Sequence, residues 1–404
     1  MLTSVAIRQS RLWAAVFMIA LPAGAQAQDS EVDPIPDPEP ALDGPHDPFG
    51  LGSKKFAYSL GLKFAEIYDN NVFLVPDGRT SDYITVFLFT SKARLEYEAG
   101  TAHVSYRARE RLFARQGEFD GLEHFLTASG TLEPRPFRFE AGLEWRDLKD
   151  PFDVLQVTGH FDTRYDREHL KATADFNRFD VELTAALARF SIDDATLDRG
   201  DFQRREFAAT GLAEAWPKVA LLAEFAIRGT DYDDSEFSDF TFMRFTAGAR
   251  GSLTPKTRTE ARVGIGRAEP DGGGSFPVED VTGLVAEVSV TWDIGEKQML
   301  KVDLRREPIE SVVSGLAIAD GFRITYRQAI AEGWTAHGML SWDRQEESDG
   351  TGGRRGLQAR GHLRWTSPGQ VHSDLGLLFR TRDSEDSTLD YENFRISLGL
   401  GVQW

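Results

Sequence analysis

The last stretch of the chain decides the fold class: Asn393-Phe394-Arg395-Ile396-Ser397-Leu398-Gly399-Leu400-Gly401-Val402-Gln403-Trp404. Every second residue from Phe394 to Trp404 is apolar, and the residues between them are polar or glycine. Successive side chains of a β-strand point to opposite faces, so this stretch predicts a strand with one apolar and one polar face. A strand of this kind that ends the chain on an aromatic residue is typical of barrels in the outer membrane of Gram-negative bacteria.

The same alternation continues back to Lys54 in segments of roughly 10 to 16 residues, which is the pattern of a transmembrane barrel with lipid on one face and water on the other. It predicts an antiparallel up-and-down barrel of 18 strands, at residues 54–66, 82–98, 102–115, 122–132, 137–148, 164–176, 179–191, 202–215, 218–231, 239–252, 257–268, 281–293, 298–309, 317–329, 333–346, 354–366, 371–383 and 390–404. A soluble β-sandwich or propeller would also alternate, but its strands are usually shorter.

Short and long connections alternate along these segments. Ala99-Gly100 and Trp216-Pro217 are examples of the short ones, and residues 229–239 and 267–280 are examples of the long ones. This alternation predicts short turns in the periplasm and longer loops outside the cell.

Tryptophan prefers the two membrane interfaces, and its positions fit the same scheme. We predict a girdle of Trp145, Trp216, Trp292, Trp334, Trp342, Trp365 and Trp404. Trp334 and Trp342 lie eight residues apart, and eight tilted strand residues climb roughly 20 Å, close to the apolar band of about 25 Å expected of such barrels.

The N-terminus predicts secretion. Residues 1–27 carry Arg8 and Arg11, a short apolar run, and Ala25-Gln26-Ala27 before the predicted cleavage site, as in a signal peptide. The apolar run is too short for a membrane anchor. Residues 28–52 then form an acidic, proline-rich tail that we expect to be a disordered periplasmic spacer or a docking arm for a basic partner. The barrel occupies residues 53–404.

Composition excludes several classes of protein. The formal net charge of -18 argues against nucleic-acid binding. The chain has no cysteine, which excludes a lipoprotein anchor, a disulfide and a cysteine nucleophile. After the leader, no apolar run is long enough for a transmembrane helix.

The polar faces of the predicted strands carry many arginines, whose guanidinium groups bind carboxylates and phosphates in bidentate fashion. The candidate pore-lining residues are Arg107, Arg109, Arg111, Arg204, Arg244, Arg250, Arg323, Arg327, Arg360, Arg364 and Arg380. Acidic residues such as Glu140, Glu182 and Glu260 share these faces. Each arginine therefore has two possible roles: it binds anions that pass through the pore, or it forms an ion pair that stabilises the barrel wall.

No catalytic or metal-binding motif accompanies this pattern. The histidines are scattered, and neither Gly-x-Ser-x-Gly nor His-Glu-x-x-His occurs. We therefore expect neither an enzyme nor a cofactor or metal site.

One segment resembles a known family. Tyr68, Asp69, Asn71, Val72 and Phe73, followed by Ser81 and Asp82 and then by Leu95-Glu96-Tyr97, are similar to the opening of the putative β-barrel porin 2 family. Asp69, Asn70 and Asn71 are also ordinary turn formers. The resemblance implies an outer-membrane barrel of 18 strands, often in exopolysaccharide systems beside a periplasmic polysaccharide-export protein.

These observations leave three functions open. The first is an outer-membrane pore that exports an anionic polysaccharide with such a periplasmic partner, and the second is a general or anion-preferring diffusion porin for small anions. The third, an outer-membrane hydrolase, has the least support. In each case the partners include outer-membrane lipids and exclude nucleic acid.

Overall fold

The computed structural model describes residues 55–149, 162–193, 201–233, 238–271, 280–311, 315–347, 352–385, 387 and 390–404. The predicted leader and tail, residues 1–52, lie outside this part of the chain. The described strands are β1 (Lys55–Asp69), β2 (Asp82–Tyr97), β3 (Gly100–Phe113), β4 (Gly121–Leu132), β5 (Phe137–Leu148), β6 (Thr163–Asp175), β7 (Phe179–Ile192), β8 (Phe202–Trp216), β9 (Val219–Tyr232), β10 (Phe240–Thr254), β11 (Thr257–Pro270), β12 (Val281–Gly295), β13 (Gln298–Ser311), β14 (Gly315–Ala331), β15 (Trp334–Glu347), β16 (Gly353–Thr366), β17 (Val371–Ser384) and β18 (Tyr391–Gln403).

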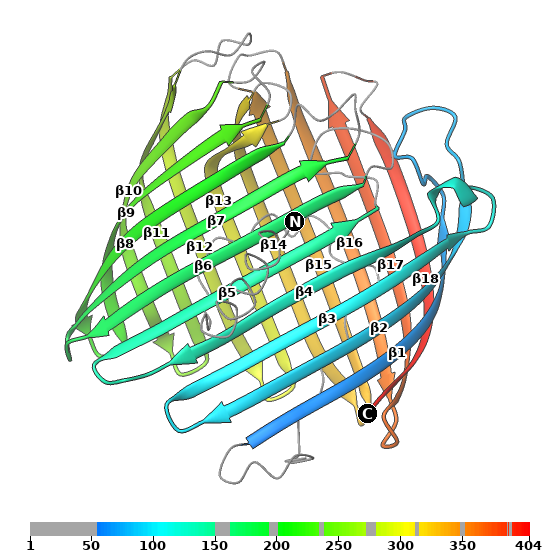
Figure 1. Cartoon of the computed structure of the whole chain (residues 1–404), viewed down its shortest axis with the longest axis horizontal. Coiled ribbons are helices and arrows are strands. Elements are labelled where there is room, and N and C mark those ends of the chain that lie inside the picture. The colour runs from blue at the N-terminus through cyan, green and yellow to red at the C-terminus, as the bar shows by residue number, and fades with distance from the viewer. Residues whose placement is uncertain are drawn as a thin grey trace, which may run out of the picture.

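These strands form one 18-stranded antiparallel sheet that closes on itself. Each strand pairs with its neighbours in the chain, and β1 also pairs with β18, from Gly61↔Gln403 to Asp69↔Arg395. Figure 1 shows β2 to β8 crossing the near side and β11 to β16 crossing the far side with the opposite tilt. Closure leaves no unpaired edge strand, and the fold predicted from the alternation is confirmed, with every strand boundary close to its predicted position.

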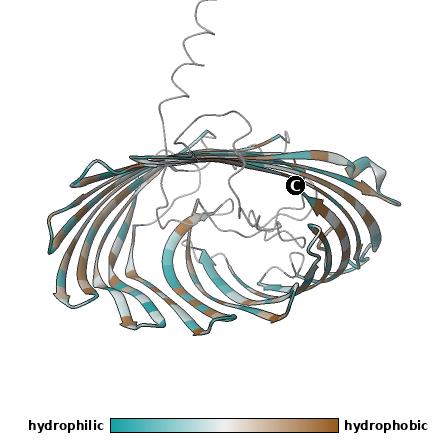
Figure 2. Ribbon diagram, turned by 90° about the horizontal axis from the view of Figure 1, so that it is seen from below, coloured by the Kyte–Doolittle hydropathy of each residue, from teal (hydrophilic) through white to brown (hydrophobic). Residues whose placement is uncertain are grey.

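Burial separates the two faces of the sheet. In β18, Leu398 and Leu400 are 61% and 62% exposed, whereas Asn393 and Arg395 are only 0% and 9% exposed. Soluble proteins bury their large apolar side chains, so this pattern is the reverse of theirs. The outer face is therefore the lipid-facing surface, and the polar face lines the lumen. The hydropathy colouring in Figure 2 shows the alternation along the strands.

The described part of the chain contains one short 3-10 helix, η1 (Gly117–Phe119), in the loop between β3 and β4. Among its residues, no helix has the length and apolar character needed to cross a membrane.

Candidate functional site: the barrel lumen

The strand register fixes which side chains share the lumen face. Residues that pair on neighbouring strands point to the same face of the sheet. The lumen face can therefore be followed from strand to strand, starting at the buried Arg109 and Arg111, through pairs such as Thr90↔Arg107 and Gln358↔Arg380. The register places all the predicted pore-lining arginines on the lumen face: Arg107, Arg109, Arg111, Arg204, Arg244, Arg250, Arg323, Arg327, Arg360, Arg364 and Arg380.

Charge is distributed unevenly around the lumen. One half, the lumen faces of β14 to β18 and β1 to β3, is here termed the basic wall. Its described cationic residues are Lys63, Lys92, Arg94, Arg107, Arg109, Arg111, Arg323, Arg327, Arg354, Arg360, Arg364, Arg380, Arg382 and Arg395. They outnumber its acidic residues, which are Asp69, Asp82, Glu96, Asp343, Glu347 and Asp374.

The other half, the lumen faces of β5 to β13, is an ion-paired wall. Glu224 accepts hydrogen bonds from Arg244 (3.0 Å) and Arg262 (2.6 Å). Arg250 links Glu260 (2.7 Å) to Glu182 (2.8 Å), and Lys171 extends the network from Glu182 at 3.0 Å. Arg244 and Arg250 therefore form ion pairs that stabilise the barrel wall, which is the second of the two interpretations of the lumen arginines.

In the basic wall, single carboxylates are shared among several cations. Asp374 lies 2.5 Å from Lys63 and 2.7 Å from Arg364, and His362 contacts it at 2.9 Å. On the neighbouring β4, Glu123 binds both Arg109 and Arg111. Because each carboxylate serves at least two permanent cations, these contacts hold the arginines in place and leave the wall with net positive charge.

Aromatic rings support the same side chains. The guanidinium of Arg107 lies 3.8 Å from the ring centre of Phe125, and Tyr391 lies beneath both Arg380 (5.7 Å) and Arg382 (5.0 Å). A guanidinium over a ring face is attracted by the quadrupole of the ring. These stacks fix the orientation of arginine side chains that would otherwise have many rotamers.

The hairpin of β13 and β14 folds into the lumen at its extracellular end. Arg228 of β9 donates a hydrogen bond to the carbonyl of Pro308 in β13 at 2.7 Å, although β10, β11 and β12 lie between these strands in the sheet. Leu316 of β14 packs in one buried cluster with Phe240 and Phe242 of β10. These contacts between distant strands narrow the lumen on the side of the ion-paired wall.

The family motif builds a second inward-folded element. Asp69 accepts hydrogen bonds from the backbone of Asn71 (2.8 Å), from Asn393 (2.5 Å) and from Arg395 (2.5 Å), across the seam between β1 and β18. Asn71 in turn donates to the carbonyl of Glu392 at 3.0 Å. The turn-former interpretation missed this buried network, because its partners lie more than 300 residues away in the chain.

The apolar part of the motif packs inside the barrel. Val72 lies in a buried cluster with Ile67, Ile84 and Phe113, and Phe73 packs against it. Asp82 accepts hydrogen bonds from the backbone amides of Arg115 (3.0 Å) and Gln116 (3.1 Å). The ring of Tyr68 contacts that of Tyr83 in a tilted arrangement, with 5.3 Å between ring centres, and Ser81 precedes β2. The motif thus folds the first extracellular loop over the lumen side of β1 to β3.

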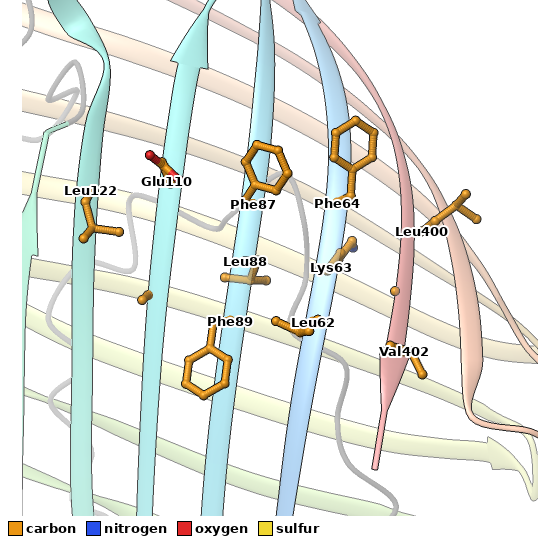
Figure 3. Close-up of a pocket in the computed structure, with 12 residues that line it drawn as sticks. Leu62, Lys63, Phe64, Phe87, Leu88, Phe89, Glu110, Leu122, Leu400 and Val402 are labelled. Carbon is orange, nitrogen blue, oxygen red and sulfur yellow. The ribbon is translucent and has the colours of Figure 1, made fainter.

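The outer surface carries the predicted tryptophans. Trp216, Trp292, Trp334, Trp365 and Trp404 are between 36% and 62% exposed, and Trp145 and Trp342 face outward by register. A register shift at the end of β8 turns Trp216 to the outer face. Figure 3 shows an apolar pocket that is lined by Phe64, Phe87, Phe89 and Leu122.

Among the residues that the structure describes, no three His, Asp or Glu side chains are grouped so that they could hold a metal ion.

Several solved structures are similar to this chain. No curated protein sequence matches the chain. OpdK of Pseudomonas aeruginosa, solved with vanillate, is 9% identical with a TM-score of 0.45, covering 86% of this chain and 99% of OpdK. OccK9 (OpdG) of the same organism is 11% identical with a TM-score of 0.46, covering 86% of this chain and 98% of OccK9. A BenF-like porin from Pseudomonas fluorescens Pf-5 is 9% identical with a TM-score of 0.44, covering 86% of this chain and 99% of the porin.

The family model described as Putative beta-barrel porin 2 matches residues 45–404, which include every strand of the barrel. This outer-membrane β-barrel therefore belongs to the Putative beta-barrel porin 2 family.

Proposed function

We propose that the barrel is an anion-preferring diffusion pore whose selective surface is the basic wall. The observation that carries this proposal is the surplus of cationic side chains on the described lumen faces of β14 to β18 and β1 to β3. A channel lined by one sign of charge raises the local concentration of counter-ions and speeds their passage.

The cations follow one another along the channel. Arg107, Arg109 and Arg111 occupy successive lumen positions of β3, so their backbones rise by about 6.6 Å from one to the next. Each is anchored by Glu123 or Phe125. Several adjacent sites of moderate affinity suit conduction better than one strong site, because the solute must also leave.

The inward-folded β13–β14 hairpin favours diffusion of small solutes over passage of a wide polymer. Through the contact of Arg228 with Pro308, it occupies part of the lumen mouth on the ion-paired side.

Export of an anionic polysaccharide is the narrower second candidate. It is supported by the resemblance of the Tyr68–Phe73 segment to a family found in exopolysaccharide systems, and the basic wall would suit such a polymer. This candidate requires a periplasmic polysaccharide-export partner. It predicts that the purified barrel is closed to small ions or opens only with that partner.

The test is single-channel conductance and reversal potential in planar bilayers. Arg107, Arg109 and Arg111 are changed together to Ser, and a second variant changes Arg323, Arg327 and Arg360 to Ser. The matched control removes the same charge from the outer face, with Arg164, Arg205 and Arg355 changed to Ser.

We expect the anion-to-cation permeability ratio to fall roughly two- to tenfold in both lumen variants and to stay unchanged in the control. An open channel with the same selectivity in all variants would refute the anion pore. A silent native barrel that opens with a periplasmic partner would favour the exporter instead.

A further inference from the structure

The periplasmic rim carries a row of basic side chains at the tips of consecutive turns. These residues, here termed the basic rim, are Arg135 between β4 and β5, Arg178 between β6 and β7, Lys218 between β8 and β9, Lys256 between β10 and β11, and Lys297 between β12 and β13. All are exposed. None forms an ion pair with a described residue, and the ammonium group of Lys256 donates a hydrogen bond to the carbonyl of Ile294 at 3.3 Å.

Several acidic residues near these turns are engaged locally. Glu133 pairs with Arg138 at 3.4 Å, and Asp293 pairs with Arg258 at 3.6 Å. Asp175 accepts a hydrogen bond from the backbone of Asn177 at 2.9 Å. Glu214 and Glu296 also lie at this rim. The cations at the turn tips are exposed and are accessible to an acidic ligand.

The remaining short turns at the periplasmic end have no basic residue. Residues 98–100, 331–333 and 367–370 contain no Lys or Arg. The basic rim therefore covers one continuous arc, from β4 to β13, beginning a few strands from β1.

An acidic segment of the same chain precedes β1 in the sequence. Residues 28–48 contain Asp29, Glu31, Asp33, Asp37, Glu39, Asp43 and Asp47 and no Lys or Arg. They precede β1, which begins at Lys55 at the periplasmic end of the barrel. We propose that this tail docks along the basic rim, toward β4 and then onward from turn to turn.

The spacing of charges supports this path. Neighbouring periplasmic turns are two strands apart, which for strands tilted about 40° is about 12 Å along the rim. Proline-rich chain extends about 3.1 Å per residue, so acidic residues four positions apart, such as Asp43 and Asp47, are also about 12 Å apart. From Lys55 to Asp47 the chain spans about 25 Å, and the first basic turn lies roughly 20 Å from β1 along the rim.

Under this geometry Asp47 reaches the turn of Arg135, Asp43 reaches that of Arg178, and Glu39 reaches that of Lys218. In the opposite direction, past β18, the tail would meet turns without a cation. Individual surface ion pairs are weak, so the binding depends on several acting together and is sensitive to salt.

The test uses the barrel with its complete tail in lipid vesicles. Because the natural chain has no cysteine, two spin labels can be introduced cleanly. One pair joins Ala41→Cys in the tail to Ala215→Cys beside the Lys218 turn, and the other joins Ala41→Cys to Gly369→Cys on the turn between β16 and β17. We expect a short, narrow distance distribution for the first pair and a longer one for the second.

The basic-rim variant changes Arg135, Arg178, Lys218, Lys256 and Lys297 to Gln. Its control changes exposed arginines of the extracellular side, Arg79, Arg164, Arg205, Arg267 and Arg355, to Gln. We expect 1 M salt or the basic-rim variant, and not the control, to broaden the first distribution. Cleavage of the tail by a Glu-specific protease should become roughly tenfold faster under the same conditions.

A broad distribution in the native barrel at low salt, unchanged by the basic-rim variant, would overturn the proposal. So would a tail that becomes ordered only when a basic periplasmic protein is added. Neither result bears on the anion selectivity of the lumen, which is measured separately.

Discussion

Replacing Asp69 by Ala should open the seam between the first and last strands. The carboxylate is fully buried, and it accepts hydrogen bonds from Asn71, Asn393 and Arg395 at 2.8, 2.5 and 2.5 Å. Removing one partner of a buried ion pair costs about 3–5 kcal/mol, and two further donors lose their acceptor at about 1–3 kcal/mol each. Partial relaxation offsets part of this, so we expect a loss of roughly 4–6 kcal/mol in the free energy of unfolding.

The assay is equilibrium unfolding by guanidinium from lipid vesicles, followed by tryptophan fluorescence. Asp383→Ala is the matched control, because Asp383 is exposed on the outer face of β17 and should cost at most about 0.5 kcal/mol. The loss in free energy of unfolding for Asp69→Asn should lie between those of the two Ala variants, since Asn keeps the shape of the side chain and loses the charge opposite Arg395. If Asp69→Ala and Asp383→Ala unfold within about 0.5 kcal/mol of each other, the network does not hold the seam.

Two further perturbations test other parts of the barrel. Changing Arg228 to Ala removes the hydrogen bond to Pro308 and should release the β13–β14 hairpin. We expect a larger or noisier single-channel conductance. An unchanged current trace would mean that the cluster of Phe240 and Phe242 alone holds the hairpin. Changing Gly264 to Ala places a Cβ against the carbonyl oxygen of Phe245, whereas a Cβ at Gly211 meets open space. Gly264→Ala should therefore unfold at lower guanidinium concentration than Gly211→Ala, and equal midpoints would contradict the close approach of β10 and β11.

The strands were predictable because a transmembrane barrel repeats a local rule. Each residue of a strand faces either lipid or lumen, so polarity alternates with period two and needs no knowledge of distant residues. The outward tryptophans and the faces of the predicted arginines follow from the same rule. Trp216 needed in addition the register shift at the end of β8, which the alternation does not reveal.

The difference between the two inner walls was not predictable in the same way. Arg107 and Arg250 carry the same charge on equivalent faces, yet Arg250 bridges Glu182 and Glu260 while Arg107 stacks on Phe125. Which carboxylate lies beside an arginine depends on the stagger of neighbouring strands. For the contact of Arg250 with Glu182 it also depends on the curvature that brings β10 close to β7.

The sequence by itself determined the barrel, its strand count and the polarity of its two faces, because these properties follow from the local alternation of apolar and polar residues. Only the tertiary structure decided that the β13–β14 hairpin turns inward, that Asp69 joins Asn393 and Arg395, and that positive charge gathers on one wall. These features arise from contacts between residues far apart in the chain, and closure of the sheet is what brings them together.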